Sequence, residues 1–192
     1  MKNKFATLLL VMGLLPLLSF AQFVVTPDGL RNEKDLDKEY IVIDFEGKSA
    51  SELYAATKQY IVTMMTNPDE AIKADIKDAH LRYALYTPEI FSFSKMLVKL
   101  VVDADFEIDM KFKDGRIRYE IVGLNMQFKE GTNTFEFKRS KLDGWAFYDN
   151  QDKLYMKNEK QKTEDFFNSL VKELTTYILN EYNQNNTQED NW

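Results

Sequence analysis

The segment VDADFEIDMKFK at residues 102–113 is followed by Asp114-Gly115 and then by RIRYEIVGLNMQF at residues 116–128. Asp-Gly is favoured in two-residue hairpin turns, because both turn positions need a positive φ. On either side of this dipeptide apolar and polar residues alternate, which is the period of a strand with one buried face. The sequence therefore predicts a long antiparallel hairpin.

A two-residue turn also fixes which residues face each other across the hairpin. It places Phe112 opposite Ile117 and Met110 opposite Tyr119, so the apolar faces of the two strands coincide. The other face of the first strand is acidic and is expected to face solvent; it carries Asp103, Asp105, Glu107 and Asp109. A Ca²⁺ site on this row is the alternative, but carboxylates two residues apart on a flat strand lie ~7 Å apart and do not converge.

A strand and a helix are predicted upstream of the hairpin. Within residues 40–45 the apolar side chains of Ile41, Ile43 and Phe45 fall on one face, which indicates a first strand. Ser49 and Glu52 have the spacing of a capping box, in which each side chain bonds the free backbone N–H of the other residue. The helix that follows presents an apolar stripe formed by Leu53, Ala56, Tyr60 and Met64.

The remaining elements are less sharply marked. Residues 69–86 fit either a short helix capped near Pro68 or two short strands, and we interpret them as two strands with Leu81, Tyr83 and Leu85 pointing inward. Residues 135–155 predict one or two further short strands. Thr163 is the expected N-cap of a final amphipathic helix that reaches Tyr182.

These elements predict one α+β domain at residues 39–182. It has a curved antiparallel sheet of about five strands, with one helix after the first strand and a C-terminal helix packed on the same face. Residues 22–38 are read as an irregular lead-in. Residues 183–192 are rich in Asn and Gln and have little apolar surface, so they are read as a disordered tail.

The first 21 residues have the three parts of a secretory signal peptide. Lys2 and Lys4 precede an apolar run that ends at Leu18, which is shorter than a spanning helix requires. Small residues then lead to the expected cleavage between Ala21 and Gln22. The mature form is therefore expected in the periplasm or outside the cell, without a membrane anchor.

Composition excludes several classes of activity. The expected mature chain keeps 23 basic and 31 acidic residues, and this negative surface disfavours nucleic acid. The chain has no cysteine, so disulfides, thiolate nucleophiles and cysteine-based metal centres are excluded. His80 is the single histidine, and without a Gly-x-Ser-x-Gly elbow to present a nucleophile it is read as structural. No pattern indicates a cofactor.

Trp145, Phe147 and Tyr148 form the most suggestive group of side chains for a contact surface. Aromatic rings near turns bind sugars and partner proteins. Alternation also places Trp145 and Phe147 on one strand face, where they would serve equally well as core residues. The sequence therefore names a possible partner contact here and no catalytic or metal-binding residue.

Three segments resemble a family of exported Bacteroidota proteins of unknown function with a TATA-binding-protein-like fold. They are Tyr40-Ile41-Val42-Ile43, the hairpin turn Asp114-Gly115-Arg116-Ile117-Arg118-Tyr119, and Glu164-Asp165-Phe166-Phe167-Asn168-Ser169-Leu170 at the last helix. The resemblance covers most of residues 39–182. It implies a curved antiparallel sheet with one inserted and one terminal helix, and it implies no activity.

These observations favour a non-catalytic binding or assembly module of the cell envelope, with an envelope protein or a glycan as partner. The alternative is a small exported hydrolase that uses paired carboxylates, since two acids about 5 or 9 Å apart across a cleft suffice for glycoside hydrolysis. No single acidic pair stands out among the 31 acidic residues.

Overall fold

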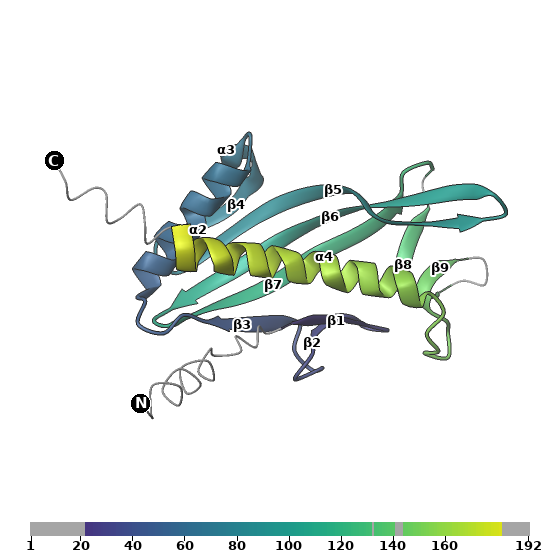
Figure 1. The fold of residues 1–192 in the computed structure, drawn as a ribbon, viewed down its shortest axis with the longest axis horizontal. Coiled ribbons are helices and arrows are strands. Elements are labelled where there is room, and N and C mark those ends of the chain that lie inside the picture. The colour runs from purple at the N-terminus through teal and green to yellow at the C-terminus, as the bar shows by residue number, and fades with distance from the viewer. Residues whose placement is uncertain (1–21, 132, 141–143, 182–192) are drawn as a thin grey trace, which may run out of the picture.

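The computed structural model describes residues 22–131, 133–140 and 144–181 (Figure 1). A small sheet contains β1 (Phe23–Thr26) and β2 (Gly29–Asn32). The main sheet has seven strands: β3 (Tyr40–Asp44), β4 (Ile72–Ile76), β5 (His80–Lys95), β6 (Val98–Lys113), β7 (Arg116–Phe128), β8 (Thr134–Lys138) and β9 (Trp145–Tyr148). The helices are α2 (Ala50–Met64), α3 (Pro68–Ala71) and α4 (Lys157–Thr176), and a π-helical turn (Tyr177–Glu181) continues α4.

Strands β4 to β9 pair in the order β4-β5-β6-β7-β8-β9. Figure 1 shows the long strands β5, β6 and β7 side by side, with α4 lying along them. The first half of β7 also pairs with β3, from Arg116 opposite Asp44 to Glu120 opposite Tyr40, whereas its far end pairs with β8. Strand β7 therefore has two different neighbours along one edge.

The predicted hairpin is confirmed in its two-residue turn and its register, although of the two turn residues only Gly115, at +75°, has the positive φ expected of both. Phe112 pairs with Ile117 and Met110 pairs with Tyr119, as the two-residue turn requires. The first strand starts at Val98 and is longer than the alternation indicated. The register shifts between Asp105 and Glu107, which places a bulge in the middle of the sheet.

Both long helices cover the same face of the sheet. The ring of Tyr54 in α2 meets Phe112 of β6 edge-on at 5.7 Å between centroids, and Phe167 of α4 meets Phe106 of β6 at 5.2 Å. Phe106 and Phe112 lie on the same face of β6 because they are separated by an even number of residues. The capping box at the start of α2 is formed by Ser49 and Glu52 as predicted.

The expectation of about five strands is wrong, because the main sheet has seven. Residues 72–95 supply the short β4 and the long β5, and both candidate segments in residues 135–155 become strands. In addition, β8 and β9 pair in parallel, which departs from the antiparallel sheet expected. Pairing direction follows tertiary packing, here the contact of Phe135 with Phe147 at 4.8 Å, and local alternation does not encode it.

The lead-in expected to be irregular at residues 22–38 contains the β1–β2 hairpin. Phe23 and Val25 are buried under α4. Their backbone N–H groups donate to the side chains of Asn168 and Glu164, each at 2.8 Å. These partners come from a helix about 140 residues later in the chain, although the Pro-Asp-Gly sequence at residues 27–29 does mark the turn between β1 and β2.

The final helix starts before the expected N-cap Thr163. Helix α4 begins at Lys157, and Thr163 is buried within it, where its hydroxyl donates to the carbonyl oxygen of Glu159 at 2.9 Å. The added turns contain Lys, Glu and Gln, which are good helix formers although they contribute no apolar stripe. The expected signal peptide at residues 1–21 and the expected tail at residues 183–192 lie outside the described residues.

Candidate functional site

The β5–β6 hairpin extends beyond the other strands at one end of the sheet (Figure 1). Lys95 pairs with Val98, which leaves Met96 and Leu97 as a two-residue turn. Their φ angles are +48° and +69°, so both residues are left-handed. We call residues 95–99 the hairpin tip.

The residue types in this turn disagree with its geometry. Turns with two left-handed residues favour Asn-Gly, because a bulky side chain costs about 1–2 kcal/mol per residue in this conformation. Met96 is 88% exposed, Leu97 is 105% exposed and Val98 is 57% exposed. Burial of these side chains therefore does not offset the strain, and apolar surface is presented to solvent at the most prominent point of the hairpin. Local rules of this kind are broken most often at functional positions.

Aromatic rings pack against the hairpin behind its tip, along residues 91–94 and 100–102, which we call the stem. Trp145 of β9 packs against Phe93 of β5 at 5.1 Å and against Phe128 of β7 at 6.2 Å between ring centroids. The ammonium group of Lys95 lies 4.3 Å from the centre of the Trp145 ring, a cation–π contact. A hollow of about 510 Å³ borders Lys95, Trp145 and Tyr155. The stem is thus packed against β7 and β9 while the tip remains uncovered.

The sequence named Trp145, Phe147 and Tyr148 as a possible contact surface, and the structure separates their roles. Trp145 is half-buried and borders the hollow beside the stem. Phe147 is completely buried in the aromatic core, so its proposal as a contact residue is wrong. Tyr148 donates its hydroxyl to the carbonyl oxygen of Val25 at 2.9 Å, which joins β9 to the N-terminal hairpin.

Sequence reasoning missed the hairpin tip. The predicted strand began at Val102, and the preceding residues 90–101 (IFSFSKMLVKLV) were not assigned to an element. A usable signal was present, because Phe91 and Phe93 alternate with serines before the tip while two lysines flank three apolar residues within it. The missing cue was a turn dipeptide, since Met96-Leu97 is not one that hairpin turns favour.

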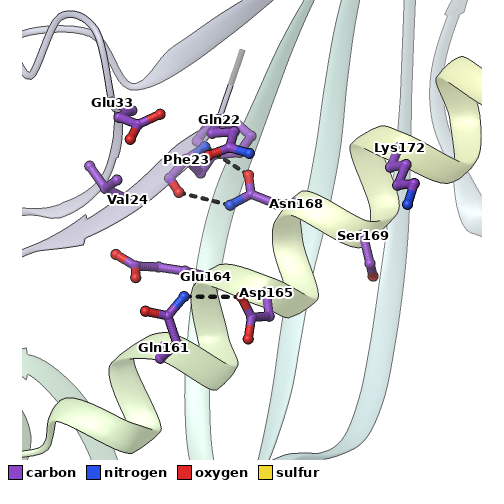
Figure 2. A pocket seen from close by; sticks show the side chains of 10 residues that line it. All are labelled: Gln22, Phe23, Val24, Glu33, Gln161, Glu164, Asp165, Asn168, Ser169 and Lys172. Atoms are coloured by element: carbon purple, nitrogen blue, oxygen red, sulfur yellow. Dashed lines mark hydrogen bonds between the residues drawn. The ribbon is translucent and has the colours of Figure 1, made fainter. Parts of the chain in front are cut away.

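A second hollow, of about 430 Å³, lies between β1 and α4. Figure 2 shows that the side chain of Asn168 makes two hydrogen bonds to the backbone of Phe23. Its Oδ1 accepts the N–H of Phe23 at 2.8 Å, and its Nδ2 donates to the carbonyl oxygen of Phe23 at 3.0 Å. Glu164 accepts the N–H of Val25 and pairs with Lys160. The side chains of Asn168 and Glu164 thus take the place of a neighbouring strand along this edge of β1. The polar groups around the hollow therefore have a structural role.

The hollow in Figure 2 also contains Gln22, the first residue of the expected mature chain. Its carbonyl oxygen accepts the backbone N–H of Glu33 at 2.9 Å. Its predicted cleavage partner Ala21 lies outside the described residues. The described fold therefore includes the residue at which the expected mature chain would start.

The acidic face of β6 is less solvated than predicted. Asp109 is buried between His80, whose Nε2 lies 2.8 Å from its carboxylate, and Arg82, whose Nε donates to it at 2.7 Å. Burial by itself would raise the pKa of Asp109, but the hydrogen bonds and charges of His80 and Arg82 lower this pKa overall. His80 thus takes part in an ordinary cross-strand network.

Asp103, at the other end of this acidic row, is also buried. It accepts hydrogen bonds from the backbone N–H of Glu89 at 2.8 Å and from the hydroxyl of Tyr86 at 2.6 Å. Both bonds favour the ionised carboxylate, and the pKa of Asp103 is lowered. The ends of the acidic row are therefore ionised structural groups.

The described part of the chain contains neither a cluster of metal ligands nor a helix that could span a membrane. Within residues 22–131, 133–140 and 144–181, no group of three or more His, Asp or Glu side chains is arranged to hold a metal ion. Over the same ranges, no helix combines the length and the apolar composition needed to cross a bilayer.

The fold defines a class: an α+β protein with a large open, mostly antiparallel sheet and a C-terminal helix on one face. No family model and no curated protein matches the chain. It is similar to the crystal structure of a DUF4468 family protein from Bacteroides ovatus, with a TM-score of 0.52 and 12% identity over 72% of this chain and 84% of that one. It is also similar to a TBP-like protein from Parabacteroides distasonis, with a TM-score of 0.51 and 12% identity over 73% of this chain and 91% of that one.

These likenesses establish the fold. They confirm the TATA-binding-protein-like architecture that the sequence resemblance implied, and the neighbours fit a family without an assigned activity. At 12% identity they carry no residue-level role to this chain.

Proposed function

We propose that this protein is an exported, non-catalytic binding or assembly module of the cell envelope, and that the hairpin tip is its contact surface. The observation that carries the proposal is the exposed, left-handed Met96-Leu97 turn. Its strain and its apolar exposure both work against the isolated fold, and both are accounted for if the turn is covered by a partner.

The chemistry of the buried acids supports binding over the alternative hydrolase. A carboxylic general acid must be protonated near neutral pH, which requires a raised pKa. Asp103 and Asp109 instead have lowered pKa values. Glu164, the buried acid beside the hollow in Figure 2, accepts the backbone N–H of Val25 and pairs with Lys160. These three carboxylates have structural partners in place of a substrate.

Export is part of the proposal and has its own test. Cleavage after Ala21 leaves Gln22 at the N-terminus of a chain whose first strand, β1, is already held by α4. N-terminal sequencing of the protein from the envelope fraction should start at Gln22, or be blocked by cyclised glutamine with the corresponding loss of ammonia in the mass. A sequence that starts at Met1 would contradict export with cleavage.

The contact surface can be tested with a variant that retains the turn. The turn variant carries Met96→Asn and Leu97→Gly, the residues that this turn type favours. Its matched control is Met64→Asn, because Met64 is also exposed, at 60%, but lies in α2 at the opposite end of the molecule (Figure 1). Wild type and control should retain an envelope component after chemical crosslinking, and the turn variant should not. Equal retention by all three proteins would refute the hairpin tip as the contact surface.

A further inference from the structure

We infer that the hairpin tip inserts into the headgroup region of an anionic lipid bilayer, so that a lipid surface is the partner of this end of the molecule. This inference rests on the proposed function, in which the tip is a contact surface. It names a partner class different from the envelope protein or glycan expected from the sequence. The contact is peripheral, because only the turn and its flanking residues take part.

The shape of the tip fits a bilayer better than a protein groove. Met96, Leu97 and Val98 are consecutive and exposed at the end of a two-residue turn, so they form a narrow convex wedge. A stable protein interface buries about 800 Å² on each partner. A wedge of three side chains offers much less area, but a bilayer interface accepts exposed apolar groups without a preformed cavity.

The charge around the tip points to the same partner. Residues 90–102 contain Lys95 and Lys99 and no acidic residue, although the chain carries a net charge of −6. Glu89 pairs with Lys99 at 2.6 Å, which offsets one of these charges. Lys162 adds another cation to the stem, where its ammonium group donates to the carbonyl oxygen of Ser92 at 3.1 Å.

The two lysines next to the apolar tip favour a lipid partner over a protein partner. Lysine is depleted from the centres of protein interfaces, because burying its ammonium group is costly. At a membrane surface the aliphatic part of a lysine side chain lies along apolar groups, while its ammonium group reaches the anionic headgroups. Lys95 has this character, since its ammonium group already lies over the ring of Trp145.

Aromatic side chains occupy the level just behind the tip. Trp145 is half-buried, Tyr155 is 69% exposed, and both border the hollow beside Lys95. Trp and Tyr are favoured at the boundary between hydrocarbon and headgroups, because one end of each ring is apolar and the other is polar. Apolar residues therefore lead at the tip, and the ammonium group of Lys95 lies together with the aromatic rings behind them, as the hydrocarbon edge and the headgroup region of a bilayer require.

Vesicle flotation tests the inference. The chain from Gln22 to Trp192 is mixed with phosphatidylcholine vesicles, or with vesicles of phosphatidylcholine and phosphatidylglycerol in equal parts. The wild type should float with the anionic vesicles, and the turn variant should bind them about ten- to a hundredfold more weakly, since two apolar side chains are removed. Met64→Asn should bind like wild type, and Lys95→Gln should reduce the preference for anionic vesicles. Melting curves check that every variant folds.

The outcomes separate the inference from the proposed function. Absence of wild-type binding to anionic vesicles, or equal binding by the turn variant, overturns lipid as the partner. If the turn variant still loses a crosslinked envelope protein in that case, the tip remains a contact surface and its partner is a protein. If neither vesicles nor an envelope component distinguish the turn variant from wild type, both proposals fail.

Discussion

The turn variant is expected to be more stable than the wild type although it removes two large apolar side chains. Met96 and Leu97 adopt φ angles of +48° and +69°, and side chains with a Cβ pay about 1–2 kcal/mol each in this region. Asn tolerates the left-handed conformation, and Gly carries no Cβ penalty. Because both native side chains are exposed in the folded state, their removal forfeits little burial.

The expected change in the free energy of unfolding combines the backbone strain that is relieved with the entropy cost of the new glycine. Glycine adds about 0.5–1 kcal/mol of backbone entropy to the unfolded chain, which offsets part of the relieved strain. The net gain in the free energy of unfolding is then about 1–3 kcal/mol, and each kcal/mol raises the melting temperature of a chain of this size by about 2–4 °C.

Urea denaturation and thermal melting of the turn variant, the wild type and Met64→Asn measure this gain. A higher unfolding midpoint for the turn variant combined with loss of envelope binding means that Met96 and Leu97 serve the contact and not the fold. A midpoint lowered by more than the difference seen for Met64→Asn would refute the reasoning, because the two side chains would then contribute to folding.

Three further predictions concern the core and its polar contacts. Phe147→Ala should destabilise the protein by about 3–5 kcal/mol in urea titrations, because it opens a cavity among the stem aromatics; a change below 1 kcal/mol would contradict its place in the core. Asn168→Ala should cost about 1–3 kcal/mol by leaving both backbone groups of Phe23 unpaired, and hydrogen exchange should show β1 opening first. Asp109 has a lowered pKa in the folded state, so its stabilising contribution is present above the unfolded pKa of about 3.9 and is lost as the pH falls through the folded pKa. Asp109→Asn should therefore flatten the acid side of the stability–pH curve, and an unchanged acid slope would argue against its pairing with His80.

Sequence patterns recovered the elements that carry strong local signals. Asp114-Gly115 encodes its own turn, and the alternation of residues 102–128 then determines the register, which is why Phe112 and Ile117 are paired as expected. The capping box of Ser49 and Glu52 is equally local. The amphipathic stripe of the last helix identified its buried side, but not its start.

Most features that the sequence did not predict depend on contacts between segments that are distant in the chain. Strand β1 is only four residues long, and besides its pairing with β2 it is held by Asn168 and Glu164 of the last helix, which lie far away in the sequence. Asp109 was expected in solvent and is buried because His80 and Arg82 of the neighbouring strand fold over it. The hairpin tip was missed for the opposite reason: Met96-Leu97 breaks the turn rule on which the interpretation relied.

We expect residues 95–99 to touch an envelope component in the cell. A photoreactive amino acid placed at Leu97, with the same substitution at Met64 for comparison, tests this claim. Irradiation of living cells should attach the Leu97 probe to a lipid or protein of the envelope and leave the Met64 probe unattached. An absent adduct at Leu97, or the same adduct at both positions, would contradict the claim.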